Sequence, residues 1–216
     1  YDLPISGEPN LDLISCSKSK EIAVLPATIP FIKPKLCVKK GDQVKIGSPV
    51  FFNKKDERIQ YVSPAAGTIK EIHYGEKRSV QAVVIACDAK EEALDLDLGV
   101  AEDIPDLETE KLVTEVCKAG LWGVFRELPF NRIPSPDRRP PSIYVTIDND
   151  EPYLPQSDVY LKEKTHEFEI GLSILKNISK DNVNVGISEN NAFATGYPRL
   201  NVSHRLKGGY PANNPA

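Results

Sequence analysis

An aromatic and arginine-rich stretch offers the side chains best suited to bind a ligand. It contains Trp122, Phe125, Arg126 and Phe130, and Arg132 follows shortly after. Aromatic and arginine side chains anchor binding interfaces, and an apolar slot with a few polar groups suits a ring-shaped ligand. We therefore expect either a hydrophobic slot or a docking patch for another protein. The alternative for Trp122 and Phe125 is that they pack a helix against a sheet.

Two further clusters could bind a ligand. Lys207 is followed by Gly208 and Gly209, and a lysine beside bare backbone amides can contact an anion. A plain glycine turn is the alternative there. The run Asp148–Glu151 could hold a divalent cation through oxygen ligands, but it lacks the spacing of a calcium loop. We interpret it as a solvated turn before Pro152.

No pattern of catalytic or metal-binding residues appears elsewhere. The chain has 3 histidines, far apart and outside any zinc motif, and 4 cysteines without a Cys-x-x-Cys pair. Neither a Gly-x-Ser-x-Gly elbow nor a Walker loop occurs. We therefore assign no catalytic, cofactor-binding or metal-binding residue to this chain.

Composition narrows the class of protein. The 216 residues carry a net charge of -4, with 40% hydrophobic and 27% charged residues, as in ordinary globular proteins. This charge gives no basic field that would attract nucleic acid. No apolar run reaches the roughly 20 residues that cross a bilayer, so we expect any membrane association to go through partner proteins.

Short β-branched runs and glycine turns dominate residues 36–85. The segments VKKGDQVKIGSPVF and SPAAGTIKEI favour a small sheet folded over itself. They resemble the barrel-sandwich hybrid of biotinyl and lipoyl carrier domains. In those carriers the modified lysine stands at a hairpin tip, which falls here at residues 53–58. The flanking residues typical of carriers are missing, so we interpret Lys54 and Lys55 as solvated turn residues.

In the second half of the chain, segments with apolar residues at helical spacing alternate with short apolar strands. After an acidic stretch at 88–105, which we interpret as a solvated linker, the spacing predicts a helix over 108–119 and a strand over 142–147. A helix over 155–177 and a strand over 182–187 follow. This alternation indicates a parallel sheet with crossover helices, in effect a Rossmann-like layer. We predict a barrel-sandwich domain at 1–97 and a Rossmann-like α/β domain at 98–216.

The order of the motifs carries a second resemblance. DLPISGEP, SPAAGTI, GEKRSVQAVVI, GLWGVFRELPF and PSIYVTIDNDEPYLP follow one another along the chain. Together they resemble the N-terminal half of the A subunit of sodium-translocating NADH:quinone oxidoreductases. The resemblance implies further domains beyond Ala216, so we expect the sequence to be part of a longer chain.

The resemblance also implies a role. The family's complex oxidises NADH on another subunit, reduces ubiquinone and exports sodium, so it is an oxidoreductase and a translocase. The A subunit is peripheral and lies on the cytoplasmic face of the bacterial inner membrane, held there by the other subunits. The resemblance implies no cofactor in this chain and a structural, quinone-associated role. The expected quinone or partner contacts are Trp122, Phe125, Arg126, Phe130, Lys207, Gly208 and Gly209.

The resemblance extends to the flavin-binding subunit of respiratory complex I, in which a glycine-rich loop cradles the FMN phosphate. Residues 120–130 occupy that position here, and bulky side chains fill it. We therefore expect no FMN. Two alternatives stay open: the C subunit of an Rnf-type electron transport complex, which usually keeps the glycine-rich loop, and a biotin or lipoate carrier module fused to an α/β domain.

Overall fold

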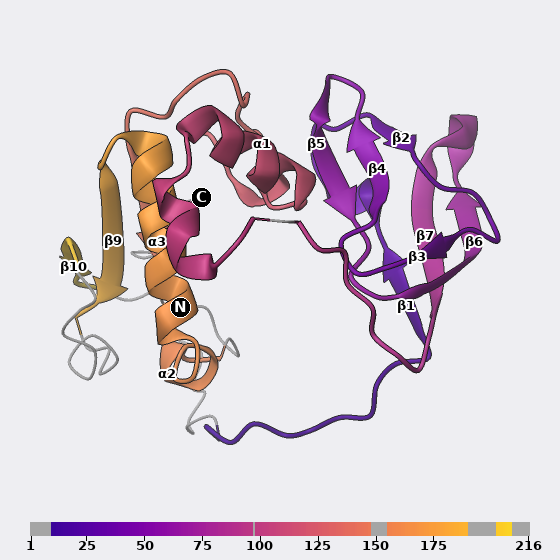
Figure 1. The fold of residues 1–216 in the computed structure, drawn as a ribbon, viewed down its shortest axis with the longest axis horizontal. Helices are drawn as coiled ribbons and strands as arrows, with labels where there is room; N and C mark the ends of the chain where they lie inside the picture. Colours follow the sequence, from indigo (N-terminus) through magenta and orange to yellow (C-terminus); the bar gives the residue numbers. More distant parts are fainter. Residues whose placement is uncertain (1–9, 97, 148–154, 190–201, 209–216) are drawn as a thin grey trace, which may run out of the picture. The chain divides into compact units, whose positions relative to one another are not determined.

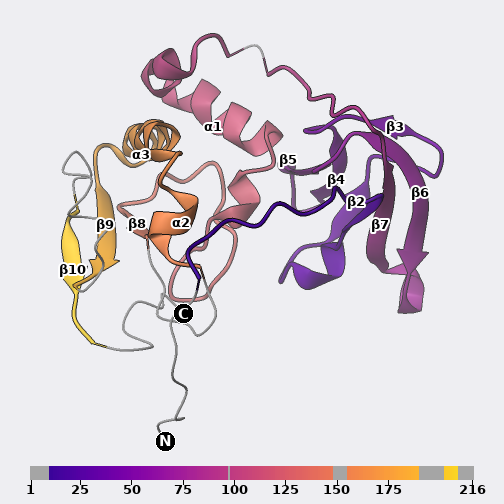
Figure 2. The ribbon, with the colours of Figure 1, turned by 90° about the horizontal axis from the view of Figure 1, so that it is seen from below.

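The computed structural model describes residues 10–96, 98–147, 155–189 and 202–208. Figures 1 and 2 show the elements in two views. In chain order they are β1 (Glu21–Val24), η1 (Pro26–Thr28), β2 (Pro34–Leu36), β3 (Gln43–Val44), β4 (Pro49–Asn53), β5 (Asp56–Val62), β6 (Gly67–Tyr74), η2 (Glu76–Arg78), β7 (Val80–Cys87), η3 (Ala101–Asp106), α1 (Thr109–Lys118), η4 (Trp122–Val124), β8 (Ile143–Thr146), α2 (Ser157–Tyr160), α3 (Thr165–Ser179), β9 (Val183–Ser188) and β10 (His204–Leu206).

Two antiparallel sheets form the N-terminal half. One has the strand order β1-β7-β6-β3 and the other β2-β4-β5. Alternate residues of these strands point inward, which buries Phe51, Ile69 and Ile85 completely. The barrel-sandwich fold expected from the sequence is confirmed, and the turn between β4 and β5 contains Lys54 and Lys55, as expected.

Two parts of the acidic stretch at 88–105 make hydrogen bonds to the rest of their compact units. The backbone N–H of Ile46 donates to the carbonyl of Glu92 at 2.8 Å, and Leu94 N–H donates to the carbonyl of Ile46 at 2.8 Å. Farther along, η3 packs on α3, where the Asn177 amide donates to the Pro105 carbonyl at 2.9 Å. Most side chains of the stretch are nevertheless exposed, and the division between the two compact units falls within it, so these contacts do not contradict the linker interpretation.

Helix α1 packs on strand β5, as both ribbon views show (Figures 1 and 2). The spacing correctly predicted this helix, which buries Leu112 and Cys117. The helix ends at Lys118 and is followed by Gly120, whose φ of +76° lies in the left-handed region, and the N–H of Leu121 donates to the carbonyl of Val116 at 3.1 Å. This is the glycine-terminated helix end that the sequence predicted.

A parallel sheet of order β10-β9-β8 forms the second half, and α3 packs against β9. Its core holds Ile147, Leu161, Val185 and Ile187. These parallel strands and the connecting helix confirm the mixed α/β class with a Rossmann-like layer.

Two details of this half differ from expectation. The helix predicted over 155–177 is broken into α2 and α3, and Leu161, which lies between them, packs into the core and is only 9% exposed. Strand β10, which was not expected, lies directly before Lys207 and pairs in parallel with β9. A strand that spans only His204–Leu206 is too short to show a periodic pattern in the sequence.

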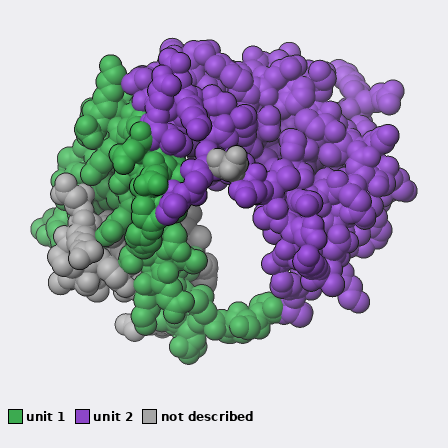
Figure 3. Space-filling view, in the orientation of Figure 1, with its two compact units in different colours: residues 1–16, 101–106, 140–216 green, residues 17–100, 107–139 purple. Residues whose placement is uncertain are grey.

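Contacts divide the chain into two compact units (Figure 3). One unit holds residues 17–100 and 107–139, and the other holds 1–16, 101–106 and 140–216. The predicted boundary between residues 97 and 98 stays a prediction. What the packing adds is that residues 107–139 belong with the barrel sandwich, because α1 and the segment after it pack on β5.

Replacing Gly120 tests this packing. Besides its positive φ, a Cβ at Gly120 would lie 2.9 Å from Cγ2 of Val62 on β5. We expect Gly120→Ala to lower the free energy of unfolding by about 2 kcal/mol or more, measured by urea denaturation. Gly41→Ala is the control, because Gly41 has φ +93° but open space around it, and should cost only about 1 kcal/mol. Equal losses of stability in the two variants would mean that the Val62 side chain moves aside at no cost in free energy.

Candidate ligand and partner site

Residues 120–139, which we call the strap, follow α1 and lie in the same compact unit as the barrel sandwich. The strap starts with η4 and then makes a loop closed by a backbone pair between Glu127 and Arg132. The N–H of Glu127 donates to the carbonyl of Arg132 at 2.6 Å. Four of the site residues expected from the sequence therefore lie on one short, hydrogen-bonded segment.

Trp122 holds the strap in place. Its side chain is 3% exposed, and its indole N–H donates to the carbonyl of Pro134 at 2.9 Å. Phe125 meets it edge to face, with ring centroids 5.2 Å apart. Buried tryptophans are stable when their N–H is paired in this way. The burial of Trp122 favours the packing role kept as an alternative for it.

Beneath η4 lies a stacked aromatic pair from the barrel. The rings of Phe51 and Tyr61 are parallel within 9° at a centroid distance of 4.5 Å. Gly123 sits directly against Tyr61, since a Cβ there would come within 2.8 Å of the Tyr61 ring. Only a residue without a side chain lets the strap approach β5 so closely.

The Tyr61 hydroxyl is buried and has no hydrogen-bond partner among the described residues. Burial raises the pKa of Tyr61, and the nearby positive charge of Arg126 partly opposes this rise. Arg126 itself is exposed, and its Nη1 donates to the carbonyl of Gly123 at 2.7 Å and to that of Phe125 at 2.8 Å. A guanidinium has five N–H donors, so Nε and Nη2 can still donate to a ligand.

Phe130 lies at the far turn of the strap and is 68% exposed. The guanidinium of Arg132 is 5.6 Å from the Phe130 ring centroid and 5.8 Å from that of Phe31, which comes from the loop after η1. Phe31 is 61% exposed. Phe31, Phe130 and Arg132 therefore form an exposed cluster of two phenylalanines around one arginine. Phe31 was not among the site residues expected from the sequence.

A bifurcated ion pair ties the strap to the β4–β5 hairpin. Arg58 on β5 donates from Nη1 to Asp137 at 2.7 Å and from Nη2 to Asp56 at 2.6 Å. Hydrogen bonds from Arg58 lower the pKa of Asp56 and of Asp137, since they stabilise the ionised carboxylates. Residues 58 and 137 are far apart in sequence, and nothing in the sequence alone indicates that they pair.

The remaining expected contacts lie elsewhere or outside the described residues. Lys207 and Gly208 follow β10 in the other compact unit, and Gly209 lies outside the described residues, as does the acidic run 148–151. At the hairpin tip, where carriers bear their modified lysine, Lys55 Nζ donates to the backbone carbonyl of Phe31 at 3.1 Å.

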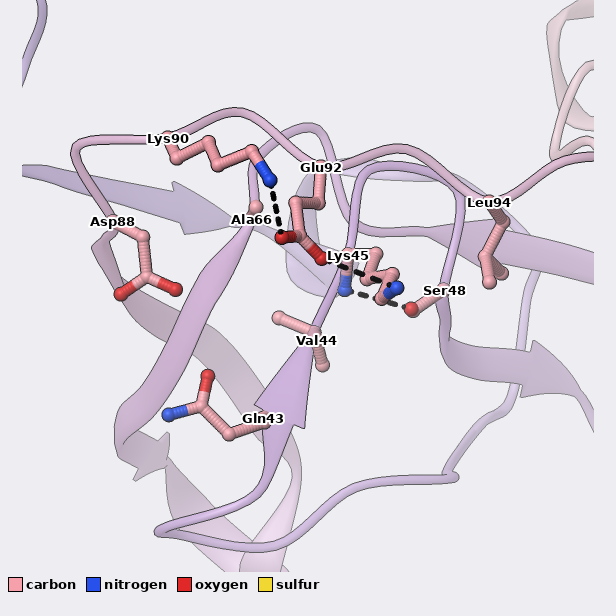
Figure 4. A pocket seen from close by; sticks show the side chains of 9 residues that line it. All are labelled: Gln43, Val44, Lys45, Ser48, Ala66, Asp88, Lys90, Glu92 and Leu94. Carbon is pink, nitrogen blue, oxygen red and sulfur yellow. Dashed lines mark hydrogen bonds and ion pairs between the residues drawn. The ribbon is translucent and has the colours of Figure 1, made fainter.

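A depression of about 570 Å³ lies beside β3 (Figure 4). Its lining residues are Gln43, Val44, Lys45, Ser48, Ala66, Asp88, Lys90, Glu92 and Leu94. Glu92 stands between Lys90 at 3.1 Å and Lys45 at 3.2 Å, and these bonds lower its pKa (Figure 4). Because the lysines are engaged and the groups are exposed, we interpret this depression as the junction between residues 88–94 and the barrel.

The described ranges hold neither a metal cluster nor a membrane-spanning helix. Nowhere in them are three or more His, Cys, Asp or Glu side chains placed together to hold a metal ion. No helix in this part of the chain is both long enough and apolar enough to cross a bilayer.

Comparison with known families agrees with this architecture. Residues 1–88 match the model of the NqrA N-terminal barrel-sandwich hybrid domain, and residues 107–216 match the NqrA second alpha/beta domain. The chain belongs to the NqrA family. The barrel sandwich described above is thus the first NqrA domain, and the second NqrA domain begins with α1 and the strap.

Curated relatives are named as the A subunit of Na(+)-translocating NADH-quinone reductase. The chain is 33% identical over 179 residues to the protein of Pseudomonas aeruginosa strain UCBPP-PA14, covering 83% of this chain and 40% of that protein. It is 31% identical over 214 residues to that of Cellvibrio japonicus, covering 99% and 48%. Against Rhodopirellula baltica it is 33% identical over 215 residues, covering 99% and 47%. The chain thus spans less than half the length of these relatives.

The unpaired Tyr61 hydroxyl gives a testable expectation. A buried hydroxyl without a partner costs roughly 1 kcal/mol or more, so Tyr61→Phe should raise the free energy of unfolding by about that amount. Tyr74→Phe is the control, because Tyr74 is 52% exposed and its hydroxyl can bond water. Urea denaturation of both variants measures the effect. A loss of stability in Tyr61→Phe would show that the hydroxyl is hydrogen-bonded in solution.

Proposed function

We propose that this chain forms part of a peripheral subunit of a sodium-translocating NADH:quinone reductase, an oxidoreductase and ion-transporting complex. The observation that carries the proposal is the match to two successive NqrA domains, together with relatives named as the A subunit of that complex. Its partners are the other subunits of the complex. These subunits hold it at the cytoplasmic face of the inner membrane.

Within the complex, the chain acts as a scaffold and contacts ubiquinone, and it does no redox chemistry of its own. The strap supports this role in two ways. Phe125 and Phe130 offer aromatic surface for a quinone ring, and the exposed Arg126 guanidinium has N–H donors left for a quinone carbonyl. Trp122 and the Arg58 ion pairs fix the strap, so these groups are held in a set geometry.

A photoreactive ubiquinone analogue tests the quinone contact. In the purified complex we expect the analogue to label the subunit that contains this chain, with adducts on the strap. Arg126→Gln should lower this labelling roughly tenfold, because it removes a charge-assisted hydrogen bond. Arg139→Gln is the matched control, since Arg139 is also exposed and its replacement by Gln removes the same charge. Labelling confined to other subunits would refute the quinone role.

The backbone of the strap also argues against flavin binding. Binding a phosphate needs free amide N–H groups, as at a glycine-rich loop. Here the N–H groups of Leu121, Val124 and Phe125 donate to the carbonyls of Val116, Leu121 and Trp122. Three amides of the segment that would hold an FMN phosphate are therefore already engaged within the protein.

Titration of FMN onto the chain tests this proposal. Because three strap amides are occupied by carbonyls, flavin fluorescence should show no saturable quenching up to about millimolar protein, the range of weak binding. Free riboflavin serves as the control for non-specific quenching, since it lacks the phosphate. Saturable binding in the micromolar range would contradict the proposal.

A further inference from the structure

A groove of about 280 Å³ lies between the strap and the loop after η1. Phe31 forms one part of its lining, Arg132 and Arg138 come from the strap, and Lys55 comes from the β4–β5 hairpin. All of these residues belong to one compact unit. Phe130 stands next to the groove, across the Arg132 guanidinium from Phe31. The groove is thus bordered by two exposed aromatic rings and lined by cationic side chains.

The charges of the groove do not balance. Its two carboxylates are already paired, Asp56 with Arg58 at 2.6 Å and Glu127 with Arg138 at 3.4 Å. Arg132 makes no ion pair among the described residues, and Lys55 Nζ donates to a backbone carbonyl, which carries no full charge. The lining holds three cations, Lys55, Arg132 and Arg138, against these two carboxylates, and Arg58 is shared with Asp137, so one positive charge is left over on a chain whose net charge is -4.

Left-handed backbone occurs at Phe31 and next to Phe130. Phe31 has φ +64°, a conformation that bulky side chains rarely adopt, and Asn131, between Phe130 and Arg132, has φ +50°. Rings exposed in this way are not stabilised by burial within this chain, and the left-handed backbone conformation at Phe31 is strained. A contact that covers the rings would compensate for this strain.

We propose that this groove docks a segment of a partner subunit in which a carboxylate stands next to an aromatic or aliphatic side chain. The carboxylate pairs with Arg132, whose planar guanidinium allows bidentate contact, and the apolar side chain covers Phe31 and Phe130. Lys55 adds a second positive charge at the rim. The proposal rests on the scaffold role proposed above and names the chemistry of the partner at that surface.

A protein segment fits this surface better than a membrane does. Adsorption to anionic lipid usually takes clusters of about 4–8 basic residues, whereas the lining of this groove has three basic residues beside two carboxylates. The negative net charge of the chain opposes approach to such a membrane. A groove of this volume also receives one or two side chains rather than a flat lipid surface.

Site-specific photocrosslinking in the assembled complex tests the proposal. The crosslinking residue para-benzoylphenylalanine replaces Phe31 or Phe130, and in the control it replaces Tyr74, which is 52% exposed in the same compact unit. We expect adducts from positions 31 and 130 on one peptide of a partner subunit, with Asp or Glu within two or three residues of the adduct. Position 74 should not label that peptide.

The charge is tested separately. Arg132→Gln should lower the yield of these adducts roughly tenfold, as loss of an interface arginine commonly does. Arg132→Lys should recover part of the yield, because it keeps the charge but loses the planar fork. Arg139→Gln should leave the yield unchanged, although it removes the same charge seven residues later in the sequence.

The outcomes separate this inference from the proposed function. Adducts to phospholipid alone, to other parts of the same chain, or to a peptide without a carboxylate would overturn the docking proposal, as would an unchanged yield in Arg132→Gln. In each of these cases the subunit would still co-purify with the complex, so its scaffold role would stand. Failure of the wild-type subunit to co-purify would instead refute the proposed function.

Discussion

The close approach of the strap to β5 is the constraint on which this compact unit depends. Gly120 lies against Val62, and Gly123 lies against Tyr61, which stacks on Phe51 in the barrel core. The contact is therefore continuous from the end of α1 to the interior of the barrel. Because side chains are absent at these two points, the backbone of the strap packs directly on β5. This contact fixes the position of the exposed groups that the strap carries.

Buried and exposed aromatics on the strap have different tasks. Trp122 is fixed by its hydrogen bond to Pro134 and by the edge of Phe125, so it contributes rigidity. Phe130 lies in solvent beside Arg132, so it is free to meet another molecule. Because the strap is already held rigidly, less conformational entropy is lost when a ligand or partner binds to it. The residue types suggested binding at all of these positions, with packing kept as the alternative for Trp122 and Phe125.

Local patterns in the sequence predicted much of the fold. The alternation along β6 and β7, the helical spacing of Leu112, Val116 and Cys117, and the helix end at Gly120 are all short-range signals. The order of motifs then identified the NqrA family resemblance, and both matches confirm it. The break between α2 and α3 was missed, because the helical spacing of the apolar residues does not show that Leu161, between the two helices, packs with Val185 and Ile187 of β9.

The candidate site was predicted only in its strap residues. Arg58 was not predicted, since it joins the site through a contact between residues 79 positions apart, and Phe31 was not predicted because it depends on an unusual turn. Spacing in a sequence does not encode such pairings. That an arginine without an ion pair among the described residues lies beside two exposed rings is evident only from the folded structure, in which the β4–β5 hairpin, the loop after η1 and the strap lie together.

The attachment of the strap to β5 also bears on how this protein can change over evolutionary time. The family boundary places α1 and the strap in the second NqrA domain, whereas their side chains and glycines are fitted to the first. Genetic exchange between homologues in the connector at 88–107 would join a barrel to a strap shaped for a different barrel. Substitutions at Tyr61 and Val62 should therefore be inherited together with matching substitutions at 120–123, as a linked set that crosses the nominal domain border.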